Sequence, residues 1–253
     1  MYLDYRNVIL SEAAYGGLPV AAWMLDEVSG IAAADLMLAA RGTNNAGTYV
    51  GSPTLGVMPG PINRSASGAP TFNGSSQCVS IADSAAIAVS SAMTVEAWVR
   101  QGSTFNRSIC GQYDSSINQR SWLMQVETSN PPKLQVTISA DGLYGSNVKR
   151  YNSTASLTVG EWSHVAFTWN GTTLALYVNG VLQTPAKVAA GAIAAIYNAT
   201  CPLKIGAAAN GAGATSYYDG RIFGVALYTY ALAAARIQYH YLAGKNGLAH
   251  TRC

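Results

Sequence analysis

Residues 160–180 read GEWSHVAFTWNGTTLALYVNG, and this stretch decides the fold. From position 165 to 169, apolar side chains alternate with smaller or polar ones, which is the period of a strand with one buried face. The pair Asn170-Gly171 predicts a two-residue turn, because both central positions of a type I′ turn need positive φ. Residues 174–178 continue the alternation, and Asn179-Gly180 marks a second turn. The stretch therefore predicts an antiparallel β-hairpin.

The same alternation appears further out along the chain. Residues 93–100 and residues 133–138 both place aliphatic side chains on one face and mostly polar ones on the other. Turn signals punctuate the remaining sequence at Asn73-Gly74, Asp141-Gly142, Asn210-Gly211 and Asp219-Gly220. Short strands with frequent turns are typical of a β-sandwich or barrel, here of about a dozen strands.

Helical signals are confined to three segments. Residues 230–242 contain strong helix formers and no breaker, and Gly244 is placed to end that helix. Residues 8–14 predict a short turn, and the alanine-rich residues 31–40 predict a helical turn or a packed loop. We therefore expect a mainly β protein with one short C-terminal helix.

The composition excludes several classes of protein. Of 253 residues, 49% are hydrophobic and only 11% are charged, against roughly 25% charged in an average domain. These values exclude bulk disorder, and a net charge of +3 without a basic cluster argues against nucleic-acid binding. We expect neither membrane insertion nor a cleaved signal peptide, because no apolar run has the length or the flanks of either.

Several stretches appear in the order of a known family. They are VAAWMLDE at residues 20–27 followed by Gly30, NNAGTYV at 44–50, FNGSSQCVSIAD at 72–83, TVEAWV at 94–99, the hairpin quoted above, and DGRI at 219–222 with Ala231-Leu232. Together they resemble the laminin-G-like domains of the concanavalin A-like lectin/glucanase superfamily. Two positions depart from the family pattern, since Asn73 replaces the usual Asp and Cys78 replaces the usual Tyr.

The resemblance implies an all-β fold, a concanavalin A-like jelly-roll β-sandwich of two antiparallel sheets with a short C-terminal helix. It predicts one sandwich domain over residues 20–244. Residues 1–19 would form an N-terminal arm or an edge segment, and residues 245–253 a flexible C-terminal tail.

The start of the chain carries a further resemblance. The run YRNVIL at residues 5–10 is similar to a lead-in that precedes this domain in proteins encoded by bacteriophages. The resemblance implies a non-catalytic protein of the virion surface that decorates a capsid or tail or adheres to a host. Its partners would be capsid or tail subunits, and its state a homo-oligomer or symmetric array. We expect the attachment to be made by Tyr2, Leu3, Tyr5 and Ile9. The alternative is that this segment is an edge strand packed on its own domain.

Tyrosine is unusually frequent, with 15 Tyr against 4 Phe. An aromatic ring with one wet end suits contact with the apolar face of a sugar. We expect cell-surface or environmental glycans to bind at Tyr113, Asp114, Tyr144, Tyr217 and Tyr218. The tryptophans are interpreted as core residues, at Trp23, Trp98, Trp122, Trp162 and Trp169.

No cofactor is expected unless calcium binds at the sandwich rim. Calcium takes oxygen ligands from loops, and four carboxylates lie next to turn signals, at Asp83, Asp114, Asp141 and Asp219. The alternative is that each carboxylate caps its own turn. His164, His240 and His250 are interpreted as surface or packing residues. The four cysteines leave open one or two disulfides or free thiols.

Glycoside hydrolysis needs two carboxylates on either side of one bond. Glu96 and Glu127 each stand alone in their strands, and Asp26-Glu27 point to opposite faces of an extended chain. We therefore expect no enzymatic activity. A secreted or cell-surface carbohydrate-binding module, with or without calcium, is the alternative to a virion protein, and a β-glucan hydrolase is the third hypothesis.

Overall fold

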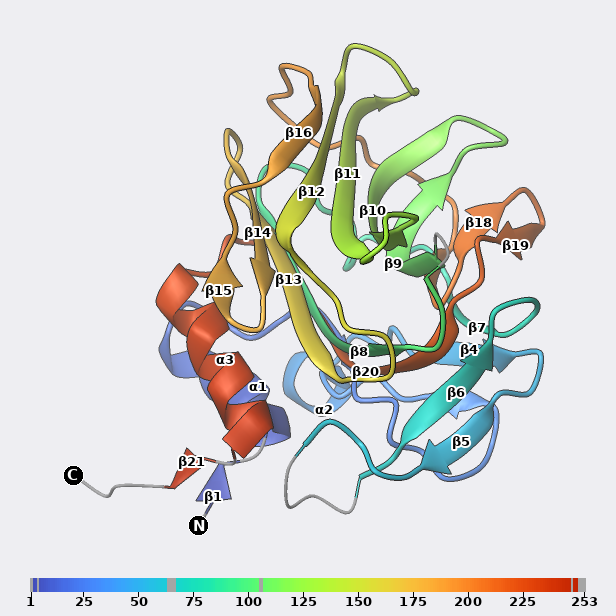
Figure 1. The fold of residues 1–253 in the computed structure, drawn as a ribbon, viewed down its shortest axis with the longest axis vertical. Coiled ribbons are helices and arrows are strands. Elements are labelled where there is room, and N and C mark those ends of the chain that lie inside the picture. The colour runs from blue at the N-terminus through green and yellow to red at the C-terminus, as the bar shows by residue number, and fades with distance from the viewer. Residues whose placement is uncertain (1, 4, 63–66, 105–106, 247, 250–253) are drawn as a thin grey trace.

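The structure is a computed structural model that describes residues 2–3, 5–62, 67–104, 107–246 and 248–249. Two antiparallel sheets are stacked face to face (Figure 1), which confirms the predicted concanavalin A-like jelly-roll sandwich. Pairing between the sheet strands is antiparallel except for one parallel bridge between Ala209 and Asp114. A separate pair joins the two ends of the chain, where β1 (Tyr2–Leu3) lies antiparallel to β21 (Leu248–Ala249).

The smaller sheet contains eight strands among the described residues, in the order β15-β14-β13-β8-β20-β6-β5, with β2 also paired to β20. Its strands are β2 (Ala21–Trp23), β5 (Thr54–Val57), β6 (Ala69–Asn73), β8 (Met93–Gln101), β13 (Ser163–Trp169), β14 (Leu174–Val178), β15 (Val181–Leu182) and β20 (Asp219–Tyr228). The two longest, β8 and β20, lie side by side at its centre.

The larger sheet contains eleven strands within the described ranges, in the order β16-β12-β11-β10-β9-β17-β7-β4-β3, with the hairpin β18–β19 beside β9. Its strands are β3 (Ala32–Ala33), β4 (Gly47–Val50), β7 (Cys78–Ile81), β9 (Arg107–Asp114), β10 (Gln119–Glu127), β11 (Lys133–Gly142), β12 (Val148–Ser156), β16 (Ala186–Ala190), β17 (Leu203–Ile205), β18 (Ala208–Asn210) and β19 (Gly213–Thr215).

The main core lies between the two sheets. Alternate residues of β13 point into it, as the sequence predicted, and the ring of Phe167 lies 6.0 Å from that of Trp122 on β10. Burial of this apolar surface is the main favourable term in folding. The tryptophans of this core are Trp23, Trp122 and Trp169. Trp98 is also a core residue, as predicted, but in a second apolar cluster on the other side of the smaller sheet. Trp162 is only partly buried against that second cluster, so its assignment as a core residue was wrong.

The hairpin of β13 and β14 has a longer loop than predicted. Four residues, 170–173, join the two strands. The Asn170 side chain accounts for the length, because its oxygen accepts hydrogen bonds from the backbone N–H groups two and three residues later. The second turn is as predicted, since Asn179 and Gly180 have φ values of 50° and 74° and connect paired strands.

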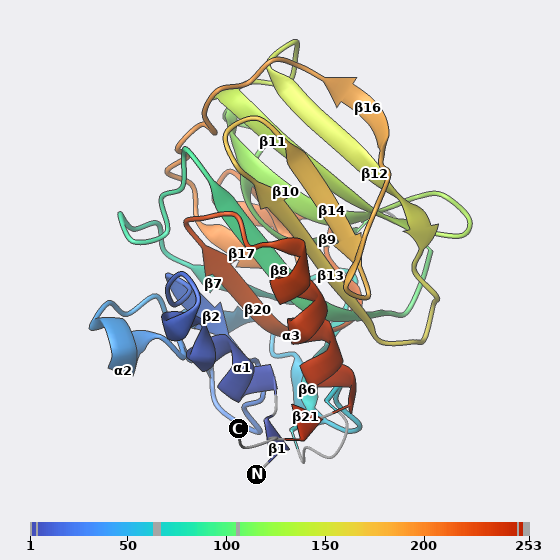
Figure 2. The same ribbon diagram turned by 90° about the vertical axis from the view of Figure 1, so that its left-hand side faces the viewer.

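Three α-helices and one 3-10 turn lie in the described residues: α1 (Tyr5–Ser11), η1 (Glu12–Ala14), α2 (Leu38–Arg41) and α3 (Ala234–Asn246). The first and the last pack against each other and cover the outer side of the smaller sheet (Figure 2). The predicted C-terminal helix therefore exists, but Gly244 lies inside it rather than ending it. A Cβ at Gly244 would lie 2.3 Å from Cζ2 of Trp98, so glycine here allows the helix to approach the sheet.

The N-terminal segment differs from an exposed attachment arm at two of its four predicted contact residues. Tyr5 and Ile9 are fully buried, because they fill the space between α1 and the smaller sheet, and the Tyr5 hydroxyl donates to the carbonyl of Gly224 at 3.0 Å. Their assignment as partner contacts was wrong. Tyr2 and Leu3 form β1. At the other end, the predicted tail starts within α3, and residues 250–253 lie outside the described residues.

Candidate functional site

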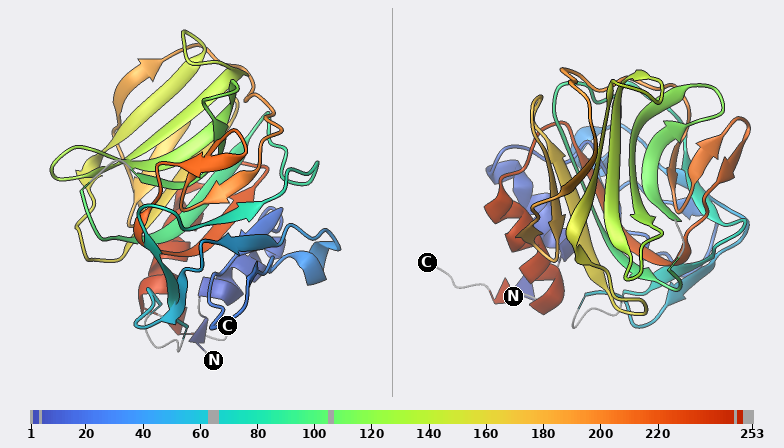
Figure 3. Two further views of the ribbon diagram at one scale, coloured as in Figure 1. Left: turned by 90° about the vertical axis from the view of Figure 1, so that its right-hand side faces the viewer. Right: turned by 45° about the horizontal axis from the view of Figure 1, so that its top comes forward.

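The outer face of the larger sheet carries a row of polar side chains. Trp122, Met124 and Val126 of β10 belong to the main core, so the residues between them face outward. The same reasoning places alternate residues of β11 and β12 on this face. No helix of the described chain covers it, because α1 and α3 lie on the far side of the sandwich (Figure 3).

Three amides form a ladder across this outer face. Gln125 donates to Gln135 at 2.7 Å, and Gln135 donates to Asn152 at 2.7 Å. The three residues are direct partners in the register of β10, β11 and β12, which is why their side chains meet. The end atoms, Oε1 of Gln125 and Nδ2 of Asn152, make no hydrogen bond to another described residue. The ladder therefore offers one acceptor and one donor to a ligand.

Aromatic rings with arginine neighbours lie along the next row. Arg150 donates to the hydroxyls of Thr137 and Tyr144, and its guanidinium lies 4.7 Å from the centre of the Tyr144 ring. This tyrosine is 57% exposed. Arg120 lies 6.0 Å from the ring of Tyr113, which packs into a small apolar cluster beside β18. Cation–π contact helps to hold each ring in place, but only Tyr144 is exposed to solvent, since Tyr113 is buried.

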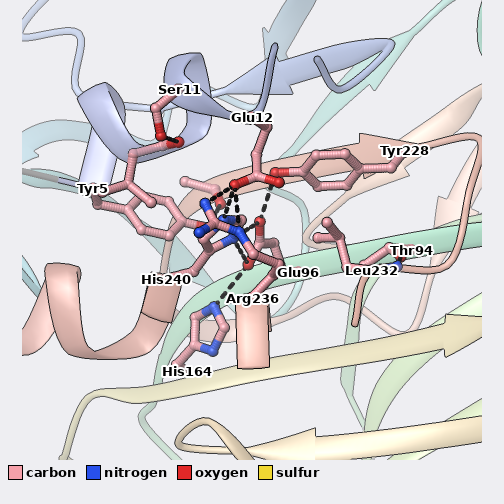
Figure 4. A network of polar contacts seen from close by, with 12 residues as sticks. Tyr5, Ser11, Glu12, Thr94, Glu96, His164, Tyr228, Leu232, Arg236 and His240 are labelled. Carbon is pink, nitrogen blue, oxygen red and sulfur yellow. Dashed lines mark hydrogen bonds and ion pairs between the residues drawn. The ribbon is translucent and has the colours of Figure 1, made fainter. Parts of the chain in front are cut away.

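The outer face of the smaller sheet has a different polar cluster, shown in Figure 4. Glu96 of β8 lies at its centre and accepts hydrogen bonds from three sides. Its partners are Nε2 of His164 at 3.1 Å, the hydroxyl of Tyr228 at 2.9 Å and Nδ1 of His240 at 2.9 Å. The other ring nitrogen of His240 lies 3.0 Å from Glu12, which also pairs with Arg236. Helix α3 supplies two of these residues and η1 supplies Glu12.

The charges in this cluster balance. Both ring nitrogens of His240 face carboxylates, so both must donate and the ring must carry a proton. Burial alone would lower the pKa of His240, but the charge of Glu96 and the hydrogen bonds to Glu12 and Glu96 raise it to about 9. Burial would raise the pKa of Glu96, yet the two histidines hold it well below its usual range. Two carboxylates therefore face one imidazolium and the Arg236 guanidinium.

This cluster binds its own members rather than a substrate. Glu12, Glu96, His164 and His240 are all fully buried. The histidines were expected to be surface or packing residues, but His164 and His240 are buried ion-pair partners. His250 lies outside the described residues. Sequence reasoning missed the cluster because Glu12 and His240 are 228 positions apart. The one available signal was the single carboxylate of this strand, at Glu96.

The family follows from a match over most of the sandwich. A laminin G family model, described as the concanavalin A-like lectin/glucanases superfamily, matches residues 73–238. The chain belongs to this superfamily. A comparison with curated proteins gives no significant match.

Solved structures share the superfamily fold at low sequence identity. Domain 4 of a GH43 extracellular arabinanase from Geobacillus stearothermophilus, in complex with arabinotriose, has TM-score 0.57 and 16% identity, covering 88% of this chain and 98% of that one. The binding domain of Paraclostridial Mosquitocidal Protein 1 has TM-score 0.64 and 12% identity, covering 89% and 52%. A botulinum neurotoxin type C structure, whose cell entry depends on two ganglioside molecules, has TM-score 0.61 and 13% identity, covering 89% and 51%. The chain thus spans about half of each toxin structure, and the likeness concerns the fold.

Within this superfamily fold, the predicted glycan residues do not gather at one place. Tyr113 and Tyr144 both lie on the outer face of the larger sheet. Tyr217 is half-buried and follows Ser216, whose carbonyl accepts a hydrogen bond from the backbone N–H of Ser108 in β9. Tyr218 is fully buried in the main core, so its assignment to a glycan site was wrong. Asp114 is also fully buried, because its carboxylate holds the turn at Ser116 and the backbone N–H of Gly211.

Two of the four predicted calcium ligands cap their own turns. Asp114 and Asp141 each accept a hydrogen bond from the backbone N–H two residues later, which is the turn-capping alternative. Asp83 accepts from the Gln112 side chain. Asp219 lies apart from them, beside Gly102. Among the described residues, no three side chains of the His, Cys, Asp and Glu types are grouped as a metal site. Calcium binding by these residues stays a prediction.

Three of the four cysteines are buried free thiols, at Cys78, Cys110 and Cys201. The fourth, Cys253, lies outside the described residues. Burial raises the pKa of the Cys201 thiol to about 12, so it stays protonated at neutral pH. None of the helices in the described ranges has the length and hydropathy needed to cross a membrane.

Proposed function

We propose that this chain is a non-catalytic binding protein on the surface of a bacteriophage virion, and that it contacts glycans with the outer face of the larger sheet. The observation that carries the glycan part is the exposed ring of Tyr144 beside the amide ladder, on a face that no helix of the described residues covers. Sugars are recognised by ring contacts to their apolar side and by a few placed donors and acceptors. Tyr144 supplies an exposed ring, and the Gln125–Gln135–Asn152 ladder supplies the polar groups.

The superfamily neighbours support a binding role. The arabinanase domain was solved with a trisaccharide, and the botulinum neurotoxin type C structure concerns two gangliosides. The trisaccharide belongs to a structure that this chain covers almost fully, whereas the chain covers only half of the toxin structure. The phage proteins that the lead-in at residues 5–10 resembles also work by contact. Weak contacts that are repeated in an array on a virion gain strength through multivalency.

The placement of carboxylates supports the absence of catalysis. On the outer face of the larger sheet, Glu127 pairs in register with Lys133, whereas Asp141 lies eight residues further along β11. At about 3.3 Å per residue the two carboxylates are roughly 26 Å apart, against the roughly 5–10 Å that glycosidases use. Glu96, the carboxylate considered for a hydrolase, is enclosed and fully occupied by its partners.

The glycan role is tested by a matched pair of tyrosine variants. Tyr144 and Tyr15 are both exposed, at 57% and 63%, and both have an arginine over the ring, but Tyr15 lies beside α3 on the opposite side of the sandwich. A glycan array would select the strongest neutral oligosaccharide, and calorimetry would then compare the variants. Tyr144→Ala should weaken binding about five- to tenfold, while Tyr15→Ala should not change it. Equal losses, or binding by neither wild type nor variants, would contradict the proposal.

The virion part rests on the YRNVIL lead-in and is tested separately. Mass spectrometry of purified virions should find the protein in stoichiometric amounts with capsid or tail subunits. If glycan binding is retained but virions lack the protein, the secreted or cell-surface carbohydrate-binding module becomes the better assignment, with an extracellular location.

A further inference from the structure

Two arginines face each other on the outer side of the smaller sheet. Arg100 of β8 and Arg221 of β20 are direct partners in the antiparallel register. Both follow the alternation that puts Glu96 and Trp98 on this face, so their side chains leave the sheet on the same side. Like charges placed directly opposite each other on adjacent strands destabilise a sheet. The pair therefore calls for a counter-charge.

The described residues supply no direct counter-charge to this pair. Neither guanidinium has a carboxylate oxygen within ion-pair distance in the described part of the chain, although five ion pairs are present elsewhere in it. Arg221 donates to the carbonyl of Pro59 at 3.1 Å, and Nε of Arg100 donates to that of Gly160 at 2.5 Å. These contacts fix the two side chains without neutralising them. Burial, and then the charge of Arg100, lower the pKa of Arg221, as expected for facing cations.

The two arginines line a pocket of about 360 Å³, which we call the arginine pocket. Thr71 continues the same row on β6, since it pairs in register with Arg221. Gly160 forms another wall, and a Cβ there would meet only Arg100, at 4.0 Å, so this side is open. The volume is sufficient for one monosaccharide unit.

An acceptor in the arginine pocket adds a second requirement. Asp219 lines the pocket, and its carboxylate oxygens are acceptors. Gln101 also lines the pocket, but it has the inner-face position of Val95, Ala97 and Val99 on β8, and its amide nitrogen donates to the carbonyl of Leu157. A ligand that fits must therefore carry hydroxyl donors as well as negative charge, which disfavours a bare inorganic anion.

We propose that the arginine pocket binds one acidic sugar unit, with its carboxylate or sulfate between Arg100 and Arg221 and a hydroxyl toward Asp219. Arginine pairs give planar oxyanions two or more charge-assisted hydrogen bonds. The site lies on the opposite sheet from the glycan face of the proposed function and does not depend on it. It would give the protein a second, charge-selective contact with acidic glycans.

Calorimetry on the full chain tests this with four probes: glucuronic acid, glucose 6-sulfate, glucose and inorganic sulfate. At least one acidic sugar should bind, and added salt should weaken it. Glucose should not bind to the pocket, and inorganic sulfate should bind more weakly than the acidic sugar. The two acidic probes separate a carboxylate site from a sulfate site. Failure of both to bind, or equal binding of glucose, would overturn the proposal.

Charge-matched variants locate the binding. Arg100→Gln and Arg221→Gln should each weaken the acidic sugar about tenfold or more. Lys187→Gln, which removes the same charge from exposed strand β16 at the edge of the other sheet, should leave the affinity unchanged. Tyr144→Ala should also leave it unchanged, so a failed glycan face and a failed arginine pocket give different results.

Thermal unfolding without ligand separates binding from a structural role. Arg100→Gln should keep or raise the melting temperature, because it relieves the repulsion between the two guanidiniums. A lower melting temperature together with unchanged sugar affinity would show that the arginines only support the fold, and the proposal would be wrong.

Discussion

The two outer faces of the sandwich both carry polar side chains, yet they use them in opposite ways. On the smaller sheet, Glu96 bonds to His164 of β13 and to His240 of α3, and His240 in turn bonds to Glu12 of η1. On the larger sheet, the Gln125–Gln135–Asn152 ladder has no helix over it and keeps free donors and acceptors at its ends. The difference teaches that a polar residue on an outer face is a binding candidate only when nothing of the same chain already occupies it.

The energetic reason lies in desolvation. A charge taken out of water is tolerated only if partners surround it, so every member of the Glu96 cluster depends on the others. The amides of the ladder are neutral, so removal of a neighbour leaves no unpaired charge, even though Gln125 and Gln135 are themselves buried. The same substitution should therefore have very different effects on the two faces.

The largest effect is expected from Glu96→Gln. It leaves the imidazolium of His240 with one carboxylate fewer in a buried site, which should lower the free energy of unfolding by about 3–5 kcal/mol. Glu127→Gln, the same change on the outer face of the larger sheet, should cost less than about 1 kcal/mol because that carboxylate is partly exposed. Urea unfolding of both variants is the measurement, and similar losses would remove the contrast between the faces.

The protonation of His240 predicts a pH dependence that the amide ladder lacks. Its pKa is raised to about 9 in the folded state. The resulting stabilisation, roughly 3 kcal/mol for a shift from about 6.5, is fully present below pH 6.5 and is lost as the pH rises through about 9. Urea unfolding at pH 6 to 9.5 should show this decline. In Glu96→Gln the decline should be smaller, and an equal slope in both proteins would assign it to other groups.

Packing of α3 against the smaller sheet predicts a smaller effect. Gly244→Ala puts a methyl group against Trp98 and should cost about 1–3 kcal/mol through overpacking. Gly145→Ala is the matched control in the β11–β12 loop of the larger sheet, because nothing lies within 4 Å of its new Cβ. Thermal unfolding should shift only for the first variant, and an unshifted Gly244→Ala would mean that the helix can move away from the sheet.

The smallest effect on stability is expected in the amide ladder. Gln135→Ala breaks both of its hydrogen bonds and should cost only about 1 kcal/mol, since the partners left behind are neutral amides and not buried charges. Its effect should appear instead as weaker binding of a neutral oligosaccharide. Gln77→Ala, which also loses two hydrogen bonds but lies before β7, is the control and should not alter binding. A stability loss without any change in binding would make the ladder purely structural.

Local patterns predicted the strands well and the sites poorly. Alternation placed β8, β11 and β13 with the correct face inward, because a buried face imposes a period of two residues on the sequence itself. The loop at Asn170 was predicted too short, since a side-chain cap can extend a turn that the residue pair alone does not reveal. Tyr218 and Asp114 were expected at a surface because tyrosine and aspartate usually lie there. Their burial in the folded chain excludes them from a glycan site.

The sequence by itself determined the fold class, the hairpin positions and the two-sided pattern of the strands, because these depend on neighbours within a few residues. The tertiary structure alone decided which outer face is closed. The closed face exists because η1 and α3, which come from opposite ends of the chain, meet over Glu96. The arginine pocket exists because the register of β8 and β20 brings Arg100 and Arg221 opposite each other. Charge pairing acts through space over a few ångströms, so it leaves no periodic trace in the sequence.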